Sequence, residues 1–157
     1  MACLIVIEGP DARIVHEISH DVTLIGKNFG PAHREHLSLD KDTQVSGRNA
    51  DGSRQGHAAV LRSGENYVLE DLGSLNGTEI SVGEMRVRLN PGHRYALKDK
   101  DVLLCGSSKI VFWLGAVMPD GGEKDALARR AAGIRLSESI TRVLPGEDIP
   151  TVVKPRK

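Results

Sequence analysis

Short apolar segments alternate with turn-forming residues over the first 115 positions of the chain. The segments with strand-like patterns are 4–7, 13–18, 22–25, 57–62, 67–70, 86–89, 95–97, 102–104 and 109–114. Glycine, proline, asparagine and serine separate them, and these residues turn a chain at low steric cost. The rhythm predicts an all-β domain, built as a sandwich or a barrel.

Two stretches depart from this rhythm. Residues 40–56 have no sustained apolar period and are rich in aspartate, serine, asparagine and glycine, which predicts a long loop of the kind that often carries function. After Gly115 a proline- and glycine-rich break precedes residues that favour helix. We therefore expect one domain over 1–115 and a linker or docking tail over 116–157, with a short helix near 123–132.

Composition narrows the possible functions. The 21 basic residues balance the 21 acidic ones, so the charge gives no reason to expect direct nucleic-acid binding. The longest apolar runs are far shorter than the roughly 20 residues that cross a bilayer, and no signal pattern precedes them. We expect an intracellular protein without membrane contact, with Cys3 and Cys105 as small buried side chains.

Catalysis is not expected. The histidine pairs His16 with His20 and His33 with His36 are weak candidates for metal or acid–base chemistry, because no cysteine lies near either pair. No metalloprotease, phosphate-loop or nucleophile-elbow motif occurs in the chain. The sequence predicts neither a metal site nor a cofactor.

Residues 71–78 are the most informative segment, because they combine turn chemistry with exposed polar groups. Asn76 and Gly77 tolerate positive φ, and Asp71, Ser74 and Thr78 have short side chains that can bond to nearby backbone and brace the turn. Asn76 is the residue left to face a partner. The segment is predicted to be a recognition loop.

This octet matches the D-x-x-S-x-N-G-T pattern of the forkhead-associated (FHA) domain and resembles it residue for residue. Residues 24–27 and the histidine-led segment 56–60 also resemble FHA motifs, in the correct order. The resemblance covers roughly residues 3–114. It implies an eleven-stranded FHA-type β-sandwich of two antiparallel sheets that binds phosphothreonine peptides and recruits a phosphorylated protein.

The resemblance also implies a binding site, with two departures from the family pattern. Lys27 stands where the family has an arginine, so a single-point ammonium replaces a planar fork. The family serine lies three residues before the histidine, a position that Arg54 holds here. One alignment uses Ser53 with Arg54, which is our preferred interpretation, and the other uses Ser46 with Arg48.

The remaining site residues lie in or near the recognition loop; Asn76 matches the family pattern without irregularity, whereas the aliphatic Leu75 cannot donate to phosphate. Asn76 is expected to bond the peptide backbone, and Leu75 to border the threonine methyl group. Structural support is expected from the residues around them, namely Gly26, His57, Asp71, Ser74, Gly77 and Thr78.

A second interpretation is a degenerate FHA domain that acts as a homodimerisation or scaffold module with weak or no phosphopeptide binding. Lys27 and the irregular serine loop favour it. Residues 26–28 and 73–78 also resemble the FHA domain of the DNA-damage checkpoint mediator, a family in which FHA domains dimerise, but residues 7–12 equally resemble bacterial FHA proteins, so the source stays open. A mediator of that kind would be nuclear, and otherwise we expect a cytoplasmic signalling adaptor.

Overall fold

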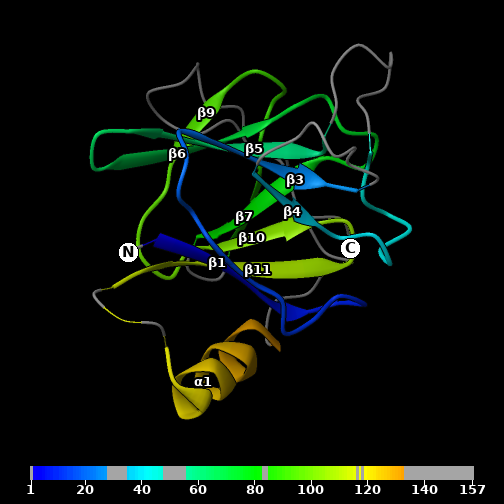
Figure 1. The fold of residues 1–157 in the computed structure, drawn as a ribbon. Helices are drawn as coiled ribbons and strands as arrows, with labels where there is room; N and C mark the ends of the chain where they lie inside the picture. The colour runs from blue at the N-terminus through cyan, green and yellow to red at the C-terminus, as the bar shows by residue number, and fades with distance from the viewer. Residues whose placement is uncertain are drawn as a thin grey trace.

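The computed structural model describes residues 2–27, 35–47, 56–82, 85–115, 117 and 119–132, and within them two β-sheets pack face to face (Figure 1). The six-stranded sheet has the order β2 (Val15–Glu17), β1 (Ala2–Glu8), β11 (Ser108–Leu114), β10 (Val102–Cys105), β7 (Thr78–Val82) and β8 (Met85–Arg88). The five-stranded sheet has the order β4 (His36–Ser38), β3 (Val22–Gly26), β5 (Ala58–Ser63), β6 (Asn66–Asp71) and β9 (Arg94–Ala96). The predicted all-β sandwich is confirmed.

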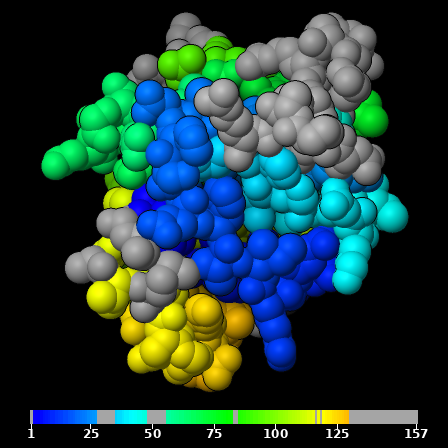
Figure 2. Space-filling model, viewed as in Figure 1, coloured from blue at the N-terminus to red at the C-terminus, as the bar shows by residue number. Residues whose placement is uncertain are grey.

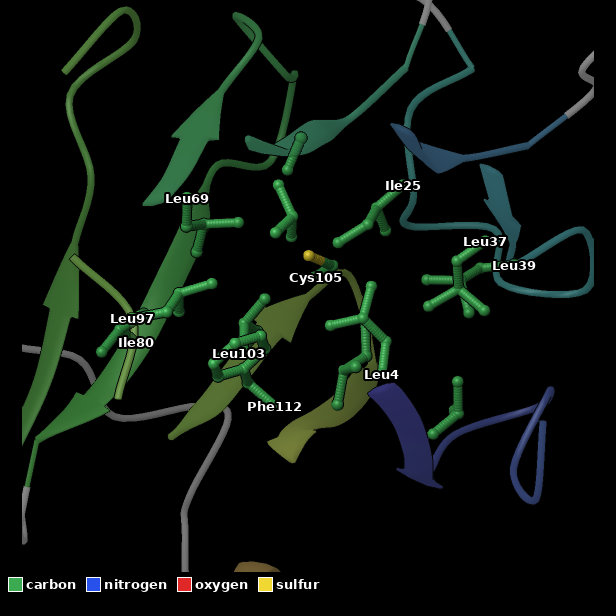
Figure 3. Packing of buried hydrophobic residues seen from close by; sticks show 14 of the residues in the cluster. Leu4, Ile25, Leu37, Leu39, Leu69, Ile80, Leu97, Leu103, Cys105 and Phe112 are labelled. Carbon is green, nitrogen blue, oxygen red and sulfur yellow. The ribbon is translucent and has the colours of Figure 1, made fainter. Parts of the chain in front are cut away.

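The core lies between the inner faces of the two sheets. Leu4, Leu103 and Phe112 of one sheet meet Ile25 and Leu69 of the other, as Figure 3 shows, and all five are fully buried. Cys105 belongs to the same cluster, and Cys3 is equally buried on the opposite face of the six-stranded sheet. Both thiols are packed as small apolar side chains, as the sequence predicts.

A single helix within the described residues, α1 (Gly121–Ala132), packs on the outer face of the six-stranded sheet beside β1 (Figure 1), and its yellow and orange atoms form the bottom of the molecule in Figure 2. Leu127 packs there among apolar side chains that include Cys3, Val111 and Trp113. A capping box begins the helix, since the Glu123 amide donates to Asp120 Oδ1 at 2.8 Å and the Asp120 amide donates to Glu123 Oε1 at 3.4 Å. The part of the tail that holds α1 is thus packed on the sheet.

Two strands were absent from the sequence prediction and one was too long. β4 pairs with β3 in parallel. It was missed because its three residues are too few to show an apolar alternation. β7 directly follows the recognition loop, and its buried Glu79 interrupts the apolar alternation. The strand expected at 13–18 begins only at Val15, because Arg13 has a φ of 83° in the turn that follows β1.

Strand register brings one set of loops to one end of the sandwich. Ile25 at the end of β3 pairs with Ala58 at the start of β5, and Ala58 pairs with Asp71 at the end of β6. Thr78 at the start of β7 pairs with Cys105 at the end of β10. The segments after β3, before β5 and between β6 and β7 therefore share one rim.

Candidate phosphopeptide-binding rim

The recognition loop 71–78 is held in shape by the buried carboxylate of Asp71. One oxygen, Oδ2, accepts from the amides of Gly73 and Ser74 at 3.0 and 3.2 Å. The other, Oδ1, accepts from the hydroxyls of Ser74 and Thr78, both at 2.6 Å. These four bonds fix both ends of the loop, so its middle residues are presented on a rigid support.

The next residues of the loop, Leu75 and Asn76, are exposed at its tip. Leu75 has a relative exposure of 71 %, which is unusual for a large apolar side chain. Asn76 is also exposed, and its Nδ2 donates to the carbonyl of Gln44 at 2.8 Å. The carbonyl oxygen of the Asn76 amide remains available as an acceptor.

His57 is the internal link between the recognition loop and segment 39–47. Its Nδ1 accepts from the Ser46 amide at 3.0 Å, so Nε2 carries the proton and donates to the Gly77 carbonyl at 2.8 Å. The His57 side chain is fully buried. Its two hydrogen bonds brace the rim from inside, and the supporting role of His57 stays a prediction.

Burial lowers the pKa of His57 below 6.5, and this outweighs the opposing hydrogen bond to Gly77 and the nearby Asp71 and Asp42. The unfolded chain then binds the proton more readily, so His57 contributes stability that is complete above pH 6.5 and is lost as the pH falls below it.

We therefore expect the free energy of unfolding to fall by about 1 kcal/mol per pH unit just below pH 6.5 through this residue. Denaturant unfolding of the wild type and of His57→Gln across that range measures it. Glutamine offers one acceptor and one donor but does not titrate, so its curve should lack this slope. Equal slopes would show that His57 takes up its proton equally in the folded and unfolded states, so that burial does not lower its pKa.

Ser46 lies at the centre of the rim. Its Oγ accepts from the Leu75 amide at 3.1 Å, while its own amide bonds His57. A serine hydroxyl that accepts in this way still has its proton to donate. The structure thus joins Ser46 to the recognition loop, whereas Ser53, Arg54 and Arg48 lie outside the described residues.

Lys27 approaches the same segment from the end of β3. Its Nζ donates to the Asp42 carbonyl at 3.3 Å, which leaves two ammonium protons for other acceptors. The preceding Gly26 permits the close approach of the segments that hold Ser46 and Gly56, because a Cβ at this position would lie 3.0 Å from the Gly56 Cα and 3.1 Å from the Ser46 carbonyl oxygen. The expected supporting role of Gly26 therefore has a steric reason.

Asp42 is a supporting residue that sequence reasoning missed. Its fully buried carboxylate accepts from the Gln44 amide at 3.0 Å, the Ser107 amide at 3.0 Å and the Ser108 hydroxyl at 2.6 Å. These bonds hold segment 39–47 against the turn between β10 and β11. The carbonyls of Asp42 and Gln44, which meet Lys27 and Asn76, are positioned by this carboxylate.

Of the histidines considered for metal chemistry, His36 lies in β4 and His33 lies outside the described residues. His16 and His20 both contact the buried carboxylate of Glu35, which also accepts from the Thr23 hydroxyl at 2.6 Å. Burial would raise the pKa of Glu35, but these donors together with the Ser19 amide lower it to about 2. Across the described ranges, no group of three or more histidine, cysteine, aspartate or glutamate side chains is arranged to hold a metal ion.

None of the helical segments in the described part of the chain has both the length and the apolar character to span a bilayer.

Comparison with known proteins supplies independent information about this rim. The family model described as the FHA domain matches residues 23–106, a range that contains Lys27, Ser46, His57 and the whole recognition loop. The match covers more than half of the chain and runs from β3 to the turn that follows β10.

Two curated proteins are similar in sequence. Protein FraH of Nostoc is 29% identical over 106 residues, which are 66% of this chain and 35% of FraH. The oxoglutarate dehydrogenase inhibitor of Corynebacterium jeikeium is 30% identical over 96 residues, which are 55% of this chain and 61% of that protein. The chain thus matches less than two thirds of the length of either relative.

Solved structures share the fold at low sequence identity. An FHA domain from Arabidopsis thaliana aligns with a TM-score of 0.57 and 21% identity over 76% of this chain and 90% of that one. EmbR of Mycobacterium tuberculosis, solved with a low-affinity phosphopeptide, aligns with a TM-score of 0.54 and 23% identity over 76% of this chain and 26% of EmbR. The FHA domain of Chlamydia trachomatis CT664 aligns with a TM-score of 0.54 and 20% identity over 73% of this chain and 98% of that one.

Proposed function

This chain belongs to the FHA domain family, and from that membership we propose that its rim binds a phosphothreonine peptide and so recruits a phosphorylated protein. The proposed contacts are the ammonium of Lys27, the hydroxyl of Ser46, the side chain of Leu75 and the amide of Asn76. Phosphothreonine-peptide binding is the common activity of FHA homologues, and the structural relative EmbR was solved with a low-affinity phosphopeptide.

The observation that carries the proposal is the junction at Ser46. Its hydroxyl bonds the Leu75 amide beside Asn76, and Lys27 donates to the same segment at Asp42. A phosphothreonine carries nearly two negative charges and three acceptor oxygens, and so needs a cation together with neutral donors at fixed positions. Lys27 supplies the cation and Ser46 a neutral donor, and the bonds from His57 and Asp42 limit the freedom lost on binding.

Ser46 therefore takes the place of the loop serine in this proposal. The sequence-based preference for Ser53 with Arg54 stays a prediction, as does a contact from Arg48. Leu75 cannot donate to phosphate, but its exposed side chain suits contact with the threonine methyl group.

Titration of a degenerate phosphothreonine peptide library, with an unphosphorylated library as control, tests the proposal on the full chain. Light scattering on the same samples measures the mass. We expect binding that requires the phosphate, and the selected peptides would indicate the class of partner. A dimeric mass with no phosphate-dependent binding would instead support the scaffold module. The similarity to the checkpoint mediator stays a prediction, and the partner class that the selected peptides indicate would test it.

Replacing Lys27 with arginine is expected to tighten phosphopeptide binding by about three- to tenfold. A guanidinium can form two parallel bonds to phosphate oxygens where an ammonium makes a single-point contact. Calorimetric titration of Lys27→Arg with a selected peptide measures the change, and Lys98→Arg, an exposed site after β9, is the matched control. An unchanged affinity would place Lys27 outside the phosphate contact.

A further inference from the structure

Arg88, the last residue of β8, lies against the recognition loop although nothing in the sequence pattern marks it. Its guanidinium packs on Gly77, since a Cβ built on that glycine would be 2.5 Å from Arg88 Nη2 and 2.6 Å from Cζ. Gly77 directly follows Asn76. The positive charge of Arg88 therefore lies next to Asn76, the residue proposed to hydrogen-bond the backbone of the bound peptide.

The charge of Arg88 is not matched by the acidic residue opposite it. Glu79 pairs with Arg88 across the two strands, but its Oε1 accepts from Arg86 Nε at 2.8 Å and Nη2 at 2.7 Å. Glu79 and Arg86 are both buried and neutralise each other. Within the part of the chain that the structure describes, no hydrogen bond or ion pair engages the Arg88 guanidinium.

The position of β8 leaves this guanidinium open to a ligand. β8 is an edge strand of the six-stranded sheet, and the Arg88 side chain is only half-buried. The planar guanidinium has five donors and suits the oxygens of a carboxylate or a phosphate. Successive residues of an extended peptide advance by about 3.3 Å, so a neighbour of the residue bonded to Asn76 comes within reach of Gly77.

We propose that Arg88 forms an anion subsite beside the phosphothreonine site, where it binds an acidic side chain or a second phosphate on the same peptide. This inference rests on the proposed function, because it uses the same bound peptide. It identifies the partner class as proteins in which a phosphothreonine lies within a few residues of another anion.

The test uses the full chain and a phosphothreonine peptide that has alanine on both sides. Glutamate is introduced at each flanking position in turn, and a parallel series carries a second phosphothreonine, so the two sources of negative charge are compared directly. Fluorescence anisotropy at low and high salt measures the affinity. The variants are Arg88→Gln and the matched control Lys98→Gln, which removes an exposed charge near the opposite end of the sandwich.

At low salt, we expect glutamate at one or two adjacent positions to tighten binding to the wild type and to Lys98→Gln by about three- to tenfold. A second phosphate at the same positions should have at least that effect because it carries more charge. Arg88→Gln should bind the alanine peptide with the affinity of the wild type, within about twofold. It should not bind the peptides with an added glutamate or second phosphate more tightly than the alanine peptide. Unfolding curves confirm that this variant is folded.

Three results would overturn the inference. Wild-type protein could bind the alanine peptide in a phosphate-dependent way but gain nothing from added charge, which rejects the subsite alone. The preference could survive in Arg88→Gln, which assigns it to another cation. Finally, the absence of any phosphate-dependent binding would reject the proposed function and the subsite together.

Discussion

Replacing Asp71 with asparagine should lower the free energy of unfolding by about 2–4 kcal/mol, one of the two largest effects expected in this protein. The buried carboxylate of Asp71 accepts four hydrogen bonds, and all four donors belong to the recognition loop or its ends. Asparagine has nearly the same shape but replaces one acceptor oxygen with a donor. It leaves two donors of the loop facing an NH₂ group, which repels them.

Denaturant unfolding of Asp71→Asn measures this loss, with Ser74→Ala as the matched control. The control removes only one hydroxyl donor to the same carboxylate and should cost about 1 kcal/mol. If Asp71→Asn were as stable as Ser74→Ala, the four contacts would contribute little, and the rigidity assigned to the loop would be wrong.

Replacing Asn76 with alanine should weaken phosphothreonine-peptide binding by about 100-fold and change the stability by less than about 0.5 kcal/mol. Two hydrogen bonds between the Asn76 amide and a peptide backbone correspond to about this factor when they are lost from a desolvated contact. In the free protein Asn76 is exposed, and its bond to Gln44 competes with water.

Asn66→Ala is the matched control for this prediction, because Asn66 is an exposed asparagine at the far end of β6 from the rim. It should bind the peptide as the wild type does. Calorimetry measures affinity, and thermal unfolding measures stability for all three proteins. Full affinity in Asn76→Ala would remove Asn76 from the binding site, whereas a large loss of stability would mean that its role is structural.

Local patterns were sufficient to predict most of the sandwich and the recognition loop. The Asp71 carboxylate and the hydroxyls of Ser74 and Thr78 that donate to it lie within eight positions. The sequence alone was therefore enough to predict that these three residues brace the turn. The strands with clear alternation were likewise predicted. β4 was not predicted, because its three residues are too few to show the alternation of apolar and polar positions that marks a strand.

The parts that could not be predicted depend on contacts between distant positions. Ser46 meets His57 across eleven residues and the Leu75 amide across 29, so counting back from the histidine could not identify it. Asp42 lies in a polar stretch that reads as solvated, and its partner Ser108 is 66 residues away. Arg88 also ends a strand in the ordinary way, and only the fold brings it to Gly77.

The central claim is that a phosphothreonine occupies the rim at Lys27, Ser46 and Asn76. Backbone amide NMR of the labelled chain, recorded with a phosphothreonine peptide and with its unphosphorylated form, tests this most directly. We predict that the phosphorylated peptide alone shifts the amide signals of Lys27, Ser46, Leu75 and Asn76, while those of α1 stay in place. Shifts confined to α1 or to the opposite end of the sandwich, or identical shifts with both peptides, would contradict the account.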